Sequence, residues 1–315
     1  MEVNCRGCAG CCLDWRPLLE VGKEEPDDRR CARSSSRDDD GGNERAFSDR
    51  VPLGGSYNFV ALARDEVRTV LERGSAAALT PRFWTVEDER EGVEIGDRHV
   101  AAVAGRPVFF VGLRKPPKPV APFGREGPTW LPTCVFLDPT TLQCRVHGSD
   151  RFPDECGTYP EQTLALGAET ECERVEARFG GDRLLERNHD DPDGLLFGPQ
   201  ALGAKLFCHP RPDELEGLLD RLERGEPSPT DRAKCIAVAA ASSPGTVAVS
   251  EPHYERALER LEGDESGADD AWIGAAIGEW HRRRDRTRAD EAVPDPELAA
   301  EIEDRRGAPE TPGWE

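Results

Sequence analysis

The stretch that most constrains the fold reads Cys5-Arg6-Gly7-Cys8-Ala9-Gly10-Cys11-Cys12. A gap of two residues lets a tight turn point two thiolates at one ion, with a metal–sulfur distance of about 2.3 Å for zinc. The glycines inside the stretch can take positive φ, so the backbone can approach a metal or cluster closely. The stretch therefore predicts a tight metal-binding turn that includes Cys5 and Cys8.

The adjacent pair Cys11 and Cys12 needs a separate interpretation. Neighbouring Cα atoms are about 3.8 Å apart, which is below the ~4.4 Å floor of ordinary disulfides. Successive side chains also tend to point apart. We expect one member of the pair to join Cys5 and Cys8, while the other faces a second centre or packs inward.

A second group of cysteines follows at wider spacing: Cys134, Cys144, Cys156 and Cys172. Two short strands are predicted at residues 134–137 and 143–146, and the turn between them would bring the first two thiols together. Eight thiols in two groups of four fit two tetrahedral sites, or one cluster with spare cysteines. Four thiolates suit zinc and iron alike, so the spacing leaves zinc, iron and an Fe–S cluster open.

The remaining cysteines have no comparable pattern. Cys31 is expected to be a solvent-exposed thiol, Cys235 a core residue of an Ala-rich helix, and Cys208 with His209 only a weak ligand pair. His147 is expected to be a surface residue rather than a group that supports the metal ligands.

The combined pattern resembles the YkgJ-type cysteine-cluster family, whose members are described as zinc- or iron-chelating. The matching features are the CxxCxxCC stretch, Cys134-Val-Phe-Leu, Cys144, Pro153-Asp-Glu-Cys156-Gly-Thr-Tyr159-Pro160 and Cys172. The resemblance covers residues 1–22 and about 130–175, and it implies metal binding through the eight cysteines. Two positions depart from the family pattern, because this chain has Phe152 before Pro153 and Gly157 after Cys156, where the family often has arginine.

Outward from the cysteines, the sequence predicts an α+β protein. Residues 1–180 are expected to form an irregular cysteine-cluster domain with short β-hairpins, interrupted by a flexible insert at 23–46, and residues 181–315 a mainly helical region. Strands are predicted at 93–95, 99–103 and 107–111, with turns at Gly96-Asp97 and Gly105-Arg106. Helices are predicted at 64–73, 215–222, 231–242 behind Thr230, 254–261, 273–280 and from Pro296 behind Asp295.

The net charge of −21, from 62 acidic and 41 basic side chains, argues against binding to nucleic acid or to an anionic membrane. Only five of the basic residues are lysines, and this balance resembles the proteins of salt-loving archaea. We therefore interpret the acidity as a halophilic adaptation that keeps the surface hydrated. No apolar stretch is long enough for a membrane helix, and we expect no signal peptide and a cytoplasmic location, where thiols stay reduced.

The expected function is coordination of zinc or iron by a protein that is not an enzyme, with the metal ion stabilising a domain poor in regular structure. The alternative is an Fe–S redox protein or an accessory oxidoreductase or methylase-like enzyme. Neither GxGxxG, a P-loop, HExxH nor GxSxG occurs in the chain. The basic run Arg114, Lys115 and Lys118 is expected to be a solvated Pro-rich loop, and the alternative hypothesis is that it offsets the negative charge of a thiolate-bound metal.

Overall fold

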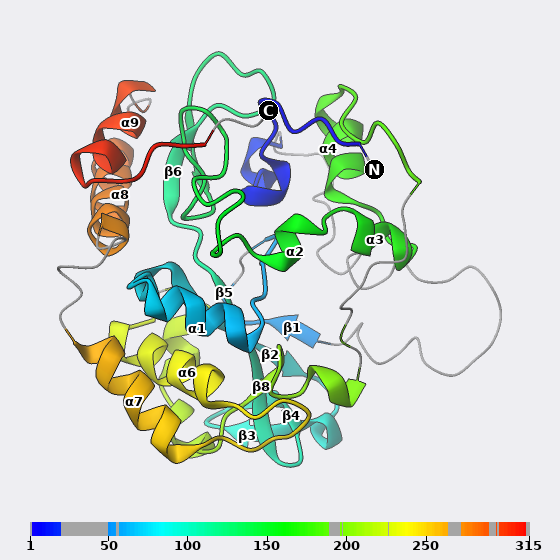
Figure 1. Cartoon of the computed structure of the whole chain (residues 1–315), viewed down its shortest axis with the longest axis vertical. Helices are drawn as coiled ribbons and strands as arrows, with labels where there is room; N and C mark the ends of the chain where they lie inside the picture. The colour runs from blue at the N-terminus through cyan, green and yellow to red at the C-terminus, as the bar shows by residue number, and fades with distance from the viewer. Residues whose placement is uncertain are drawn as a thin grey trace.

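The computed structural model describes residues 2–19, 50–54, 57–188, 196, 198–225, 227–263, 272–289, 294 and 296–312. The insert predicted at 23–46 and Cys31 within it lie outside these residues. The described chain is a mixed α+β structure with antiparallel sheets and C-terminal helices (Figure 1). This agrees with the fold class predicted from the sequence. No described helix is both long enough and apolar enough to cross a membrane.

The main sheet is antiparallel and contains β1 (Arg50–Pro52), β2 (Leu79–Val86), β3 (Gly92–Ile95), β4 (Arg98–Val103), β5 (Arg106–Leu113) and β8 (Phe207–Cys208). The turn predicted at Gly96-Asp97 is confirmed, whereas the turn predicted at Gly105-Arg106 lies one residue earlier, at Ala104-Gly105, because Arg106 already pairs with Val103. Both glycines take positive φ, 62° and 71°. The alternation of β2 buries Leu79, Pro81 and Phe83, and Phe83 pairs with Phe109 of β5, their ring centroids 4.9 Å apart. The sheet therefore carries an aromatic core.

Four helices belong to the same half of the molecule: α1 (Arg64–Glu72), α5 (Leu218–Glu223), α6 (Pro229–Ala241) and α7 (Glu251–Glu262). The α6 helix is capped by Ser228 rather than by Thr230, since Ser228 Oγ accepts from the Asp231 amide at 3.1 Å. The helix predicted at 215–222 begins later than expected, at Leu218. Gly217 takes φ 73° and separates the 3₁₀ turn Pro212–Leu215 from α5.

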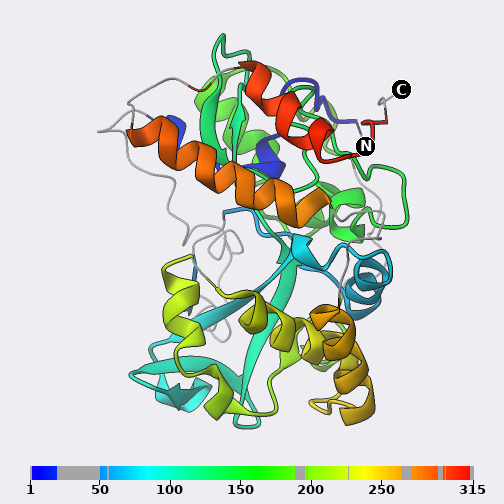
Figure 2. The same cartoon turned by 90° about the vertical axis from the view of Figure 1, so that its left-hand side faces the viewer.

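The other half of the molecule has less regular structure. It contains the two-stranded sheet of β6 (Pro117–Val120) and β7 (Thr129–Pro132), the helices α2 (Asp154–Gly157), α3 (Glu161–Ala165), α4 (Glu171–Phe179), α8 (Trp272–Ala289) and α9 (Pro296–Arg305), and the 3₁₀ turn η1 (Gly10–Cys12). Figure 2 shows α8 and α9 lying across one face of this half. Asp295, the predicted cap of α9, lies outside the described residues.

The segments 134–137 and 143–146, predicted to be strands, do not form strands in the structure. Only one isolated β-bridge joins them, between Leu137 and Cys144. Asp138 turns the chain too tightly for a longer ladder, because its carboxylate accepts from the amides of Thr140 at 2.8 Å and Thr141 at 3.2 Å. The expected proximity of the two segments is nevertheless confirmed by that bridge.

We use two names below. The cysteine half is formed by the described residues of 2–19, 114–188 and 272–312, and the sheet half by those of 50–113 and 198–263 (Figure 1). Both halves contribute to one continuous hydrophobic core. The proposed division of the chain at residue 180 stays a prediction.

Candidate functional site

The N-terminal cysteine stretch forms a compact turn. The Cys8 amide donates to the Cys5 carbonyl at 3.1 Å, and the Cys12 amide donates to the Ala9 carbonyl at 2.9 Å. Gly7 and Ala9 take positive φ, 63° and 53°. The Gly10 amide points at the Cys8 sulfur, 3.4 Å away. The spacing of the cysteines thus produces the tight turn that was predicted.

Gly10 brings this turn against α4, the helix that carries Cys172. A Cβ atom at position 10 would lie 2.7 Å from a methyl carbon of Val175, so only glycine fits without displacement. The close approach makes Cys172 a neighbour of the N-terminal thiols, although about 160 residues separate them in the chain.

Cys134 is connected to the N-terminal cysteine turn by a backbone hydrogen bond. Its amide donates to the Cys12 carbonyl at 2.7 Å, and a β-bridge pairs Leu13 with Thr133. The bridge at Leu137 then returns the chain so that Cys144 follows, and α2 supplies Cys156. Four separate segments of the chain therefore bring the eight predicted ligand cysteines to one end of the molecule.

The electrostatic neighbours of the thiols overlap, and we group the thiols into two sets. Burial is the main cause of the raised pKa of Cys5 and of Cys172, and the charge of Cys11 adds to it. Burial also raises the pKa of Cys144 and of Cys156, followed by the charge of Cys134, whereas the pKa of Cys12 is raised first by its hydrogen bond to Cys11, then by burial, and then by the charges of Cys11 and Cys134. We call the first set the α4 set: Cys5, Cys8, Cys11 and Cys172. We call the second the β7 set: Cys12, Cys134, Cys144 and Cys156. Cys11 also influences Cys144 and Cys156, so the two sets are adjacent.

Burial keeps most of these thiols protonated at neutral pH. Desolvation, followed by the neighbouring thiols, raises the pKa of Cys5 and of Cys144 to about 12. Cys11 is the exception, since a hydrogen bond from the Cys12 thiol, with the sulfurs 3.9 Å apart, lowers its pKa. The Lys115 ammonium lowers it further and lies 3.5 Å from the Cys11 carbonyl oxygen. All ten described cysteines are free thiols.

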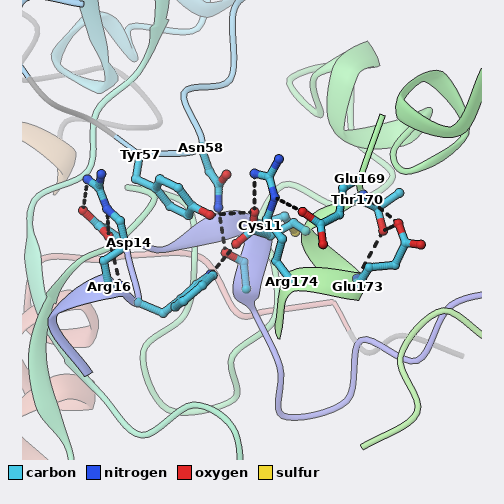
Figure 3. Close-up of polar contacts among 12 residues, drawn as sticks. Cys11, Asp14, Arg16, Tyr57, Asn58, Glu169, Thr170, Glu173 and Arg174 are labelled. Atoms are coloured by element: carbon cyan, nitrogen blue, oxygen red, sulfur yellow. Dashed lines mark hydrogen bonds and ion pairs between the residues drawn. The ribbon is translucent and has the colours of Figure 1, made fainter. Parts of the chain in front are cut away.

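A buried carboxylate holds the cysteine turn to α4 (Figure 3). Glu171, which directly precedes Cys172, accepts hydrogen bonds from the Trp15 indole and from the Tyr57 hydroxyl, the latter at 3.1 Å. Arg174 lies 3.4 Å from the same carboxylate, and Asn58 donates to the Gly10 carbonyl at 3.1 Å. Burial raises the pKa of Glu171. These contacts position both the turn and the first residue of the helix.

Sequence reasoning missed Glu171 and the helix that contains it. The local indication was present, because Thr170 and Glu173 form a capping box in which the Thr170 amide donates to Glu173 at 2.8 Å. That pattern marks the start of α4, but it does not predict that Trp15 and Tyr57 donate hydrogen bonds to Glu171. The role of Glu171 therefore depends on tertiary contacts.

The basic run does not act as one unit. Lys115 lies beside Cys11, as the alternative hypothesis requires, but Arg114 donates to the Ala77 carbonyl at 3.0 Å on the side of the sheet half. Lys118 is buried against Glu303, with Nζ 2.5 Å from Oε1. The charged ends of the three side chains therefore contact different parts of the molecule.

The two described cysteines outside the pattern, Cys208 and Cys235, lie in the sheet half. Cys208 packs with Val86, Ala101 and Val108 in a small apolar cluster of the sheet, and Cys235 is fully buried in α6. His147 packs edge-on against Phe152, their ring centroids 4.9 Å apart.

The sulfur positions do not form a coordination shell. Throughout the described part of the chain, no three His, Cys, Asp or Glu side chains are arranged so that they could hold a metal ion. The thiols are close enough to shift one another's pKa, but they do not converge on a common point. Coordination by any four of them therefore requires side-chain rotation or a small movement of the loops that carry them.

Comparison with known families overturns the resemblance drawn from the cysteine spacing. A family model, described as a family of unknown function (DUF7531), matches residues 1–315. The chain belongs to DUF7531. No curated protein and no solved structure matches it.

The assignment to the YkgJ-type family is therefore wrong, because the DUF7531 model spans the whole chain and no YkgJ-type match is found. CxxCxxCC is a short pattern that any chain can use to gather thiols in one turn. The arginines absent beside Pro153 and Cys156 were the local indication of the difference. Membership of DUF7531 assigns no activity to the cysteines.

Proposed function

We propose that the cysteine half binds zinc or iron through thiolates of the eight clustered cysteines. The observation that supports this most is the meeting of eight free thiols from four separate chain segments, at residues 5–12, 134–144, 156 and 172. Thiolates are the preferred ligands of zinc and of iron–sulfur clusters. The donor set therefore fits a thiophilic metal.

The alternative structural explanation is that the thiols merely pack as small apolar side chains. Several features argue against it. Six of the eight thiols are only partly buried, and Cys8 and Cys134 alone are buried in the core, whereas Cys208 and Cys235, which do pack in apolar clusters, are both buried. In addition, Lys115 places a positive charge beside Cys11, where a thiolate would be stabilised.

Two sites of four ligands are proposed, the α4 set and the β7 set. This differs from a division by sequence order, because Cys172 joins the N-terminal thiols and Cys12 joins the downstream ones. The adjacent pair is thereby shared between the sites, with Cys11 in one and Cys12 in the other. Since most of these thiols are protonated in the metal-free protein, metal binding at neutral pH would release protons.

The first prediction concerns metal content. Protein reconstituted with zinc, or anaerobically with iron and sulfide, is expected to hold metal, measured by elemental analysis and visible absorption. Paired Cys5→Ser and Cys172→Ser changes should remove the metal of the α4 set, and Cys134→Ser with Cys156→Ser that of the β7 set. A colourless zinc-loaded protein would identify a structural site, and an absorbing protein with stoichiometric sulfide would identify an Fe–S cluster.

Cys208→Ala is the matched control, because this thiol lies in the sheet half and its pKa is shifted by burial and by Arg106 rather than by other cysteines. The control should retain all of the metal. Unchanged metal content in both double variants, or no metal uptake by the unmodified chain, would refute the proposal.

A further inference from the structure

A pocket of about 120 Å³ lies where the chain leaves β5 and passes from the sheet half to the cysteine half. Its polar lining comes from β2, from the residues after β5 and from α8, and consists of Thr80, Arg82, Arg114, Lys115 and His281. None of the described residues that line it is acidic. Pockets between two structural units are common places for small ligands.

The charge of this pocket is opposite to that of the chain. Acidic side chains outnumber basic ones by 62 to 41, so a pocket whose described lining includes Arg82, Arg114 and Lys115 and no acidic residue is unexpected on this molecule. A concave site lined by one sign of charge concentrates ligands of the opposite sign. The lining therefore indicates an anionic ligand.

The cationic groups are held in place by the fold. Arg82 lies on β2, with its guanidinium over the Phe59 ring at 4.7 Å from the centroid. Phe59 is held in turn because the segment that contains it passes close to Gly112. A Cβ atom added at Gly112 would lie 2.1 Å from the carbonyl oxygen of Val60, the residue after Phe59. The Arg114 guanidinium donates to the Ala77 carbonyl at 3.0 Å. The pocket is thus lined by positioned side chains rather than by mobile surface lysines.

Arg114 has no ion-pair partner among the described residues, although much of it is withdrawn from solvent. Arg232 is a charged neighbour of it and donates to the carbonyl of Pro227, which also lines the pocket, at 2.6 Å. Two guanidinium groups close together in a region of low dielectric repel each other. An anion bound in the pocket beside Arg114 would offset that repulsion.

We propose that this pocket binds a small phosphate-class oxyanion, either inorganic phosphate or the phosphoryl group of a small metabolite. The planar guanidinium of arginine matches phosphate oxygens with paired hydrogen bonds, and His281 and Thr80 offer further polar groups. The volume holds several water molecules, which is the size of a phosphate ion rather than of a nucleotide. Binding here lies beyond the proposed metal coordination and does not depend on it.

The second prediction tests the pocket by calorimetric titration of the full chain with sodium phosphate, at an ionic strength kept constant with sodium chloride. Saturable binding at one site per chain is expected. Arg114→Gln and Arg82→Gln should each weaken it by about tenfold or more, since each removes charge-assisted hydrogen bonds. Arg90→Gln is the matched control, because Arg90 is exposed and pairs with Asp88 away from the pocket.

A phosphomonoester titrated in parallel separates the two sources of the anion. Tighter binding of the ester than of phosphate assigns the pocket to a phosphorylated metabolite, and tighter binding of phosphate assigns it to the free ion. If Arg114→Gln does not fold, Arg82→Gln decides alone. The proposal is overturned by the absence of saturable binding, by equal affinity for acetate, or by unchanged affinity in every folded pocket variant.

Discussion

The two halves of the molecule are stabilised by different kinds of side chain. The sheet half has an apolar centre in which the Phe109 ring contacts those of Phe83 and Phe207. The cysteine half shares the hydrophobic core but also buries most of the charged side chains that the described chain buries: Asp14, Lys118, Asp138, Arg145, Glu171 and Glu303. A region with little regular structure can therefore be ordered by specific polar contacts, because each such contact is satisfied in only one arrangement.

The centre of the polar network is Glu303 of α9. Its carboxylate lies 2.5 Å from Lys118 Nζ and 2.9 Å from Arg145 Nε, and Lys118 also donates to the carbonyls of Val135 and Leu137. Arg145 in turn is 3.4 Å from Asp138. The network therefore ties the C-terminal helix to the segment between Cys134 and Cys144.

The largest predicted effect comes from removing this carboxylate. Glu303→Leu should lower the free energy of unfolding by about 3–5 kcal/mol, because Lys118 and Arg145 then remain buried without their shared partner. Chemical denaturation measures the change. The exposed pair of Arg90 and Asp88 is the control, and Asp88→Asn should leave the free energy of unfolding nearly unchanged because water screens this pair. A similar small loss in both variants would show that the cysteine half does not depend on its buried charges.

The next prediction concerns the response of the sheet half to acid. His209 is buried beside β8, with Nδ1 2.9 Å from the Arg211 carbonyl oxygen, and burial lowers its pKa to about 4. The unfolded chain, with a His pKa of about 6.5, takes up the proton first. The stabilisation is therefore complete above about pH 6.5 and is lost as pH falls towards 4, by as much as ~3 kcal/mol.

His209→Gln tests that pH dependence. The variant should show a flatter dependence of unfolding free energy on pH between about 6.5 and 4 than the unmodified chain. His253, whose ring nitrogen lies 2.7 Å from Ser250 Oγ on the exposed side of α7, offers the matched control. An equal slope with and without His209 would contradict the prediction.

The smallest predicted effect compares two helix caps, one in each half. Thr170 caps α4 and Ser228 caps α6, each with a capping box. Replacement of either by alanine should lower the free energy of unfolding by about 1 kcal/mol. Under the proposed function, Thr170→Ala should also weaken metal retention, since α4 carries Cys172, whereas Ser228→Ala should not. Equal metal retention in both would argue against a ligand role for Cys172.

Local patterns were sufficient for much of the sheet half. The strands around Gly96 and Gly105 were predicted because alternation and turn residues act over a few positions. The strand Leu79–Val86 was missed, since Pro81 within it argues against a strand in a sequence read alone. The start of α5 was missed because a positive φ at Gly217 interrupts an otherwise helical spacing of leucines.

The candidate site was predicted in its residues but not in its arrangement. The eight cysteines stood out by spacing, and the turn at Cys5–Cys12 formed as predicted. Their assignment to sets was not predictable, because Cys172 reaches the turn through the contact of Gly10 with Val175. The contacts of Glu171 and the cationic pocket could not be predicted from the sequence for the same reason. The residues that form them come from elements far apart in the chain.

The mixed α+β class, the acidic charge, the hairpins of the sheet and the concentration of thiols in a few short segments can be read from the amino-acid sequence. These properties follow from composition and from interactions within a few residues of each other. Tertiary packing, in contrast, places α4 and its Cys172 against the N-terminal turn, buries Lys118 against Glu303, and brings Arg82 and Arg114 into one pocket. Such contacts depend on how whole elements pack, and packing is a property of the complete chain rather than of any stretch of it.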